Sequence, residues 1–295
     1  MADRFLDETR VADFWDRARR QADTDQATGY LQDEWPAALG ELRFAGEWRE
    51  VAGWLDALDV PRGSCLDVGC GTGLWLERLA GRFARVRGVD LSAEMVASAR
   101  ERLARSGHPD AAVERRSIRD LEPGERHDLV FVGGVLMYVD DEDLDAMMAR
   151  LAGLLTPRGA LILRESTASP TTWYRDAPLA PGLFTTPGAP RPPYFAVYRP
   201  PASYRALAER HGLEVVRCRP NIHYKLADLG EDWLRALDRV SGGALARRRP
   251  TAERAARVVH ALRWLTLLPA YHLARTLTPR RRRLDNWWYV CRRTG

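Results

Sequence analysis

The sequence predicts an α/β fold in which a mostly parallel, doubly wound sheet carries helices on both faces. Two observations support this prediction. From about residue 60 onward, short apolar segments alternate with amphipathic segments of about ten to fifteen residues, the pattern of β-α-β units. The chain has 295 residues, 45% of them hydrophobic, so it can form one large domain or one domain with a sizeable insertion.

The expected elements follow one another along the chain. Residues 1–60 are predicted to be helical, because apolar side chains such as Trp48, Val51 and Leu55 recur at helical spacing. Strands are expected at residues 64–68, 85–90, 111–116, 128–134, 159–166, 213–219 and 286–293. Helices are expected between them at residues 74–83, 93–107, 140–155 and 201–212. The segment 167–200, rich in proline and aromatic residues, has almost no period and is predicted to be a long loop.

A glycine-rich segment, "DVGCGTG" over residues 67–73, follows the first expected strand. A strand that ends in an acid, followed by glycines and a helix, brings backbone amides and a helix N-terminus close to a ligand. The dinucleotide fingerprint G-x-G-x-x-G requires a glycine where this chain has Leu74 or Leu76, and the lysine of a phosphate-binding P-loop is missing. The segment therefore belongs to another class of ligand site.

The order acid-x-Gly-x-Gly-x-Gly resembles class I S-adenosylmethionine (SAM)-dependent methyltransferases of the small-molecule type. The resemblance runs from about residue 62 to residue 216 and resumes at the last strand. It includes Asp90 at the end of "VRGVD" and the later segments "RSIRDL", "HDLVFVGGVLMYV" and "LLTPRGALILRE". It implies a seven-stranded sheet with an antiparallel last strand, and a core of residues 61–225 plus 285–295. A helical cap at 1–60 and a basic helical insertion at 226–284 would complete the chain.

The resemblance implies that SAM is the cofactor. Asp67 would orient the glycine loop and reach the ammonium group directly or through water, and Asp90 would accept hydrogen bonds from both ribose hydroxyls. The other implied contacts are Gly69, Gly71 and Gly73 on the methionine side, Leu91 on the adenine, Ile118 and Arg119 beside the base, and Gly133 beneath the cofactor. Ser117 departs from the pattern, since many relatives have an aspartate there.

Candidate catalytic residues follow from what methyl transfer requires. The reaction needs nucleophile, methyl group and sulfur held in line, and a general base only where the acceptor arrives protonated. The candidates are Tyr138 after the fourth strand, Glu165 at the end of the fifth, and His223 after the sixth. Each also has a plain structural interpretation. The 167–200 segment is the expected lid, and Trp15 and Tyr30 are expected to close over the cofactor.

The net charge of +5 is unevenly distributed. Eleven arginines and one acid give residues 247–283 a charge of +10, which leaves −5 for the rest. This segment has three open interpretations: peripheral contact with a membrane, binding of an anionic acceptor, or a helical roof or homodimer contact with solvated arginines. Nucleic acid is not expected as a partner, because no recognised binding module accompanies the charge.

The predicted function is methyl transfer from SAM to an oxygen or nitrogen of a small-molecule acceptor, as in secondary metabolism. Two alternatives stay open: a methyltransferase for a lipid, lipid-linked or phosphorylated acceptor at a membrane, and a SAM-binding module without transferase activity. The charged start of the chain, the lack of an apolar run of about 18 residues and four cysteines without metal-ligand spacing predict a cytoplasmic protein without a metal.

Overall fold

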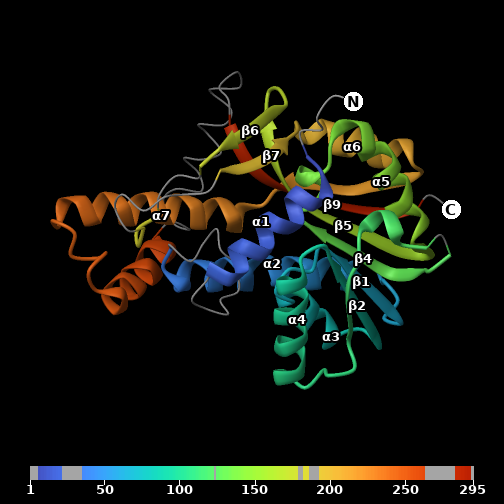
Figure 1. The fold of residues 1–295 in the computed structure, drawn as a ribbon, viewed down its shortest axis with the longest axis horizontal. Helices are drawn as coiled ribbons and strands as arrows, with labels where there is room; N and C mark the ends of the chain where they lie inside the picture. Colours follow the sequence, from blue (N-terminus) through green and yellow to red (C-terminus); the bar gives the residue numbers. More distant parts are fainter. Residues whose placement is uncertain are drawn as a thin grey trace.

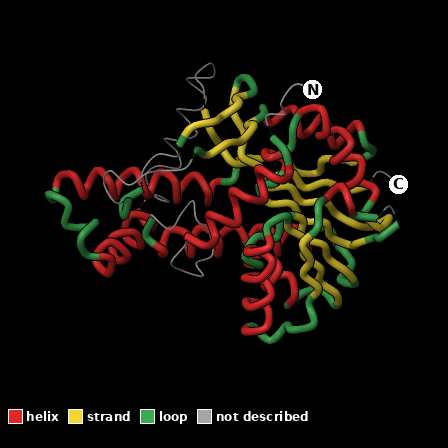
Figure 2. The backbone as a smooth tube through the Cα atoms, in the orientation of Figure 1, coloured by secondary structure: helices red, strands yellow, loops and turns green. Residues whose placement is uncertain are grey.

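A seven-stranded sheet forms the centre of the protein. The computed structural model describes residues 6–21, 35–122, 124–178, 182–185, 193–262 and 283–293. Within these residues the strand order is β3-β2-β1-β4-β5-β9-β8 (Figures 1 and 2). The strands are β1 (Ser64–Val68), β2 (Arg85–Asp90), β3 (Ala112–Arg115), β4 (His127–Gly133), β5 (Leu155–Ser169), β8 (Leu213–Pro220) and β9 (Arg283–Arg293). Strands β1 to β5 pair in parallel and β9 runs antiparallel to both β5 and β8, which confirms the predicted sheet.

Helices cover both faces of this sheet (Figure 1). They are α1 (Glu8–Gln21), α2 (Ala37–Ala57), α3 (Leu74–Ala80), α4 (Ala93–Arg105), α5 (Asp141–Gly153), α6 (Pro201–Arg210) and α7 (Ile222–Val240). Alternate residues of a strand point to opposite faces, and β4 shows the consequence. Leu129 and Phe131 pack in one cluster with α2 and α3, whereas Val130 and Val132 pack in another with α5 and α6. Burial on both faces explains why residues 129–132 of β4 are continuously apolar.

Local sequence signals correctly predicted several element boundaries. Strands β1 and β2 cover the predicted residues. The Ser92 hydroxyl caps α4 by accepting a hydrogen bond from the Met95 amide at 3.0 Å, and Glu94 lies in the first turn, where the helix dipole favours an acid. These signals were sufficient because a cap and its helix are neighbours in the chain.

The prediction of one long loop at 167–200 was wrong. Strand β5 continues to Ser169, and β6 (Trp173–Ala177) pairs with β7 (Tyr194–Tyr198) in a separate antiparallel sheet. All five residues of β7 are buried, in a cluster that includes Phe14 of α1 and Met137. Burial on both faces removed the polar–apolar alternation that would have indicated a strand.

The region before β9 is helical where the structure describes it. Helix α7 begins at Ile222, just before the expected start of the insertion, and the Asn221 side chain caps it. It projects away from the sheet (Figure 1) and shares an apolar cluster with α2 and a helical stretch at 249–262. Residues 263–282, most of the predicted basic membrane-contact segment, lie outside the described residues. None of the helices that the structure describes is both long and apolar enough to cross a membrane.

Candidate active site

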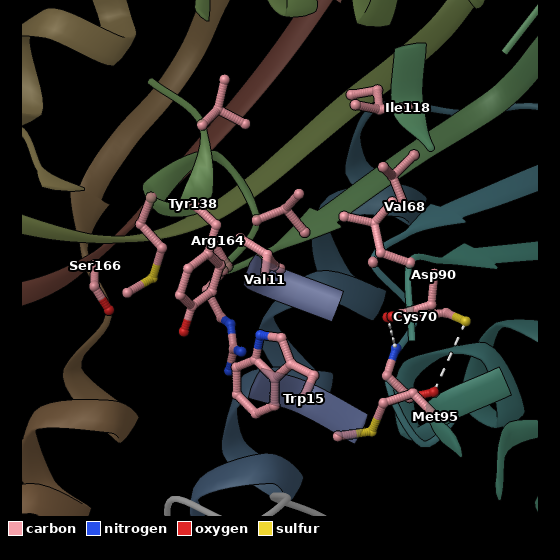
Figure 3. A pocket seen from close by; sticks show the side chains of 18 of the residues that line it. Val11, Trp15, Val68, Cys70, Asp90, Met95, Ile118, Tyr138, Arg164 and Ser166 are labelled. Carbon is pink, nitrogen blue, oxygen red and sulfur yellow. Dashed lines mark hydrogen bonds between the residues drawn. The ribbon is translucent and has the colours of Figure 1, made fainter. Parts of the chain in front are cut away.

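A cavity of about 510 Å³ lies at the carboxyl ends of the central strands. Val68 of β1, Asp90 of β2 and Gly133 of β4 line it, and Val11 and Trp15 of α1 close over it. Figure 3 shows Asp90, Cys70 and Met95 on one side of Trp15, and Tyr138, Arg164 and Ser166 on the other. This edge of an open α/β sheet is where ligands bind. Trp15 thus lies between two ends of the cavity. The first end is at the glycine loop, and the second end is at the β4–β5 side.

The glycine loop has a conformation that needs glycine. Gly69 has φ +69°, and a Cβ there would lie 2.2 Å from Cγ2 of Val135. Gly71 has φ +52° and lines the cavity, and a Cβ there would meet no protein atom within 4 Å. Gly73 does not line the cavity; it is the N-cap of α3, and a Cβ there would lie 3.0 Å from the Cα and Cβ of Ala99. The loop therefore packs tightly beneath Val135 and leaves free space beside Gly71.

Asp90 holds this loop and faces the cavity. Its Oδ2 accepts a hydrogen bond from the Gly71 amide, and its Oδ1 accepts one from the Ser92 amide, both at 2.9 Å. Burial raises the pKa of Asp90. A carboxylate oxygen has more than one acceptor position, so each oxygen can also accept a ligand hydroxyl. The geometry fits a diol such as the cofactor ribose.

The segment after β3, together with Leu91 after β2, forms the side of the cavity where the resemblance places the adenine. Leu91, Ile118 and Arg119 line the cavity there. Ser117 does not; its hydroxyl donates to Glu8 Oε1 at 2.5 Å and accepts from the Arg119 amide at 3.0 Å. Arg119 Nε donates to the same Glu8 oxygen at 2.9 Å. The serine that departs from the family pattern therefore ties the first turn of α1 to this segment.

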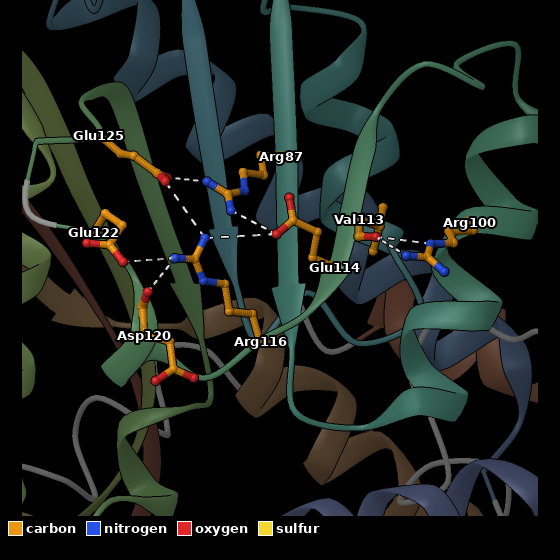
Figure 4. Close-up of polar contacts among 8 residues, drawn as sticks. All are labelled: Arg87, Arg100, Val113, Glu114, Arg116, Asp120, Glu122 and Glu125. Carbon is orange, nitrogen blue, oxygen red and sulfur yellow. Dashed lines mark hydrogen bonds and ion pairs between the residues drawn. The ribbon is translucent and has the colours of Figure 1, made fainter.

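An ion-pair network fixes the same segment from the outside. Arg116 lines the cavity and pairs with Glu114, Glu122 and Glu125, as Figure 4 shows. Arg87 of β2 also pairs with Glu114 and Glu125. Single exposed ion pairs stabilise little, but a network of this kind fixes geometry. It holds the chain after β3 at the edge of the cavity.

Asp67 lies behind the glycine loop. It is 2% exposed, and its Oδ2 is buried without a hydrogen-bond partner among the residues that the structure describes. Burial, followed by repulsion from Asp90, raises its pKa to about 8. An unpaired buried carboxyl group is stabilised by a neighbouring cation. Asp67 does not line the cavity, whereas Asp90 and the open space at Gly71 do, and these two fit a ligand that carries a ribose, as SAM does.

Of the three candidate catalytic residues, Tyr138 lines the cavity. Its hydroxyl lies 2.9 Å from that of Tyr194, which also lines the cavity, and burial raises the pKa of both phenols. Trp15 meets Tyr138 edge to face, with ring centroids 5.8 Å apart. Tyr30, the other expected lid residue, lies outside the described residues.

Glu165 and His223 lie outside the cavity lining. Glu165 is fully buried and accepts hydrogen bonds from the amides of Val135, Leu136 and Met137 at 3.0, 3.1 and 3.3 Å. These hydrogen bonds fix the turn Leu136–Tyr138, from which the Tyr138 side chain reaches the cavity. The His223 ring packs on Gly46, with Nε2 3.5 Å from Glu50 Oε1.

Sequence reasoning identified Tyr138 at the second end of the cavity but missed three other polar residues there. Arg43 of α2, Arg164 of β5 and Tyr224 of α7 line it, beside Lys225, the only lysine in the chain. Arg164 could have been found from the sequence, because it is a charged residue inside the apolar strand "GALILRES". The arginine and glutamate at i and i+4 on α2, Arg43 and Glu47, were a second.

Comparison with known proteins agrees with this geometry. Residues 65–159 match the family model of the methyltransferase domain. Trans-aconitate 2-methyltransferase of Methylobacterium radiotolerans is 32% identical over 214 residues, which cover 69% of this chain and 79% of that protein. The chain belongs to the class I SAM-dependent methyltransferases. The donor that this methyltransferase uses is SAM.

Other relatives of this methyltransferase match over less of their length. The dTDP-3-amino-3,6-dideoxy-alpha-D-glucopyranose N,N-dimethyltransferase of Streptomyces fradiae is 36% identical over 102 residues, 34% of this chain and 38% of that enzyme. The structure of magnesium protoporphyrin IX methyltransferase from Synechocystis is 22% identical with a TM-score of 0.52, covering 75% of this chain and 93% of that one. At that identity the likeness shows the fold alone.

Proposed function

We propose that the protein transfers the methyl group of SAM to an oxygen or nitrogen of a small molecule held at the second end of the cavity. The observation that carries this proposal is the continuity of the cavity. One space joins Gly71 and Asp90 to an end enclosed by the rings of Trp15, Tyr138 and Tyr194. Its volume, about 510 Å³, falls within the roughly 300–1,000 Å³ of ligand pockets.

The residues at that end suit transfer without a strong base. Bound SAM supplies an electrophilic methyl group on a sulfonium. The rings of Trp15, Tyr138 and Tyr194 exclude water from the acceptor and present electron-rich faces, which favour a nearby cation. Because the pKa values of both phenols are raised, Tyr138 and Tyr194 stay protonated and orient the acceptor by hydrogen bonds.

Acceptor-dependent formation of S-adenosylhomocysteine (SAH) tests this function. The purified chain is incubated with SAM and with phenols, amines and carboxylic acids in parallel, and SAH is quantified by mass spectrometry. We expect SAH to form with at least one acceptor and not without any. SAM binding without acceptor-dependent SAH would instead support the alternative of a binding module. The small molecules named for the relatives, an aconitate and an amino sugar nucleotide, belong in the first screen.

Tyr138→Phe tests the orienting role. Removing the hydroxyl is expected to lower kcat/KM for the best acceptor about tenfold, the effect of one hydrogen bond of about 1.4 kcal/mol, and to leave SAM affinity unchanged. Tyr174→Phe is the matched control, because Tyr174 is 52% exposed and does not line the cavity. Unchanged kinetics in Tyr138→Phe would remove Tyr138 from the acceptor site.

A second proposal concerns where the enzyme works. We infer that the enzyme acts in the cytoplasm, and its four free cysteines support this. We also infer that helix α7 makes peripheral contact with a membrane surface. Trp233, Leu237 and Val240 follow one face of α7 and are 53%, 44% and 89% exposed. Helix α7 carries acids as well as Arg235 and Arg239, but three exposed arginines at 247–249 follow it, and apolar residues near basic ones suit an anionic lipid interface.

Vesicle sedimentation tests this contact. We expect the protein to sediment with vesicles containing phosphatidylglycerol, and Trp233→Ser with Leu237→Ser to abolish this. Phosphatidylcholine vesicles are the control for charge. Failure of the parent to bind anionic vesicles rejects the proposal. A dimer in light scattering that the same variant dissociates would assign the face to a second copy of the chain.

A further inference from the structure

Arg43 is a buried cation with an incomplete set of partners. Its side chain is 6% exposed and lines the cavity, and its Nε is buried without a hydrogen-bond partner among the described residues. The nearest acid is Glu47, whose Oε1 lies 3.8 Å from Arg43 Nε, beyond hydrogen-bond distance. The guanidinium carbon lies 5.3 Å from the centroid of the Tyr224 ring.

Glu47 is already engaged by two other groups. Its Oε2 accepts a hydrogen bond from Arg164 Nη1 at 3.0 Å, and its Oε1 accepts one from Asn221 Nδ2 at 2.7 Å. Arg164 Nε is also buried without a hydrogen-bond partner within the described part of the chain. Two guanidinium groups thus share one fully buried carboxylate. Glu47 by itself balances one of these two charges, and burying a charge without a partner is costly.

The other carboxylates at this end act on Lys225 rather than on Arg43. Lys225 Nζ donates to Asp228 Oδ2 at 2.9 Å, and Asp285 also lines the cavity and acts on Lys225. Burial lowers the pKa of Arg43 by more than the carboxylate of Glu47 raises it, and the neighbouring charge of Arg164 lowers it again. Within the described residues, Glu47 is thus the one carboxylate that pairs with the two arginines, and Nε of each arginine is left without a hydrogen-bond partner.

We propose that Arg43 and Arg164 bind an oxyanion, a carboxylate or a phosphate, that belongs to the methyl acceptor. The inference rests on the proposed function and narrows its acceptor to anionic compounds. Guanidinium groups match both oxyanions with parallel N–H donors, and they bind them most strongly where water is excluded. Arg164 and Tyr138 both line the cavity, and Figure 3 shows both on the opposite side of Trp15 from Asp90. The Trp75 ring, 5.9 Å from the Arg164 guanidinium carbon, offers an apolar wall for the body of such an acceptor.

Matched probes with and without charge test this site. Titration calorimetry on the SAH-saturated protein compares benzoate and phenyl phosphate with benzamide, a neutral isostere of benzoate. We expect at least one of the two anions to bind about tenfold or more tightly than benzamide, since a hydrogen bond to a charged group contributes about 1.5–3 kcal/mol. The two anionic probes distinguish a carboxylate from a phosphate. Equal binding of all three, or no binding of either anion at millimolar concentration, overturns the proposal.

Arg43→Met assigns the effect to this arginine. Glu47 keeps Arg164 and Asn221 as partners, so we expect this variant to fold with a melting temperature equal to or above that of the parent. The anion preference should disappear in Arg43→Met and persist in Arg158→Met, whose side chain is 69% exposed on the surface. Arg43→Lys, which keeps the charge, should recover part of the preference and remains informative if Arg43→Met misfolds.

The affinity for SAH separates this inference from the function on which it rests. If Arg43→Met weakens SAH binding as strongly as anion binding, the arginine holds the carboxylate of the cofactor and the proposal is overturned. If the parent binds no SAH, the proposed function itself fails. If the parent methylates neutral acceptors only, the function stands and the anion site alone is rejected.

Discussion

Replacing Asp90 by alanine is expected to weaken SAM binding by about a hundredfold or more. The carboxylate has an acceptor position left on each oxygen, and two charge-assisted hydrogen bonds to ribose hydroxyls contribute at least about 1.5 kcal/mol each. The substitution also removes the acceptor of the Gly71 and Ser92 amides, so the glycine loop loses its anchor. Calorimetric titration with SAM measures the effect directly.

Two further variants make this result interpretable. Asp90→Asn keeps one acceptor oxygen without the charge and should bind SAM with an intermediate affinity. Asp110→Ala removes an exposed acid from the loop before β3 and should leave the affinity unchanged. A dissociation constant for Asp90→Ala within threefold of the parent value, in a protein that is folded by circular dichroism, would contradict the assigned ribose site.

Replacing Glu165 by alanine should destabilise the fold by at least about 3 kcal/mol. Three backbone amides would lose their common acceptor, and each unsatisfied buried donor costs about 1–3 kcal/mol. Urea unfolding followed by tryptophan fluorescence measures the loss. Glu142→Ala, on the exposed side of α5, is the control and should change the free energy of unfolding by less than about 0.5 kcal/mol.

Glu165 also gives the free energy of unfolding a pH dependence of known sign. Burial raises its pKa from 4.5 to about 7. As the pH rises through this interval, the unfolded chain releases a proton that the native state retains, so this group's contribution to stability falls between pH 4.5 and 7. Glu165→Gln cannot titrate and should show a shallower decline than the parent. An unchanged slope would show that Glu165 does not titrate in this interval.

The cofactor end of the cavity was largely predictable from the sequence. The glycine loop, its flanking strand and helix, and Asp90 lie within one short β-α-β unit. Gly69, Gly71 and Asp90 therefore take up their positions through local backbone geometry. The structure adds what local reasoning does not reach. The Ser117 hydroxyl donates a hydrogen bond to Glu8, which is far from it in the sequence. Gly73 is the N-cap of α3 and does not line the cavity.

The acceptor end shows the opposite situation. Glu165 was singled out because it ends a strand beside the cavity, yet its neighbour Arg164 is the one that lines it. Adjacent strand residues point to opposite faces, and the sequence does not state which face holds the ligand. His223 was chosen for its chemistry, and packing against Gly46 places it outside the cavity lining.

By itself, the sequence determined the strands of the central sheet, the helices between them and the class of cofactor, because strand–loop–helix geometry is encoded by residues close together in the chain. Only the tertiary structure decided which side chains meet at the acceptor end. Arg43, Arg164, Tyr194 and Tyr224 come from four separate elements. Their proximity follows from how α2, β5, β7 and α7 pack together, and neither hydrophobic periodicity nor motif spacing reports contacts between elements so far apart in the chain.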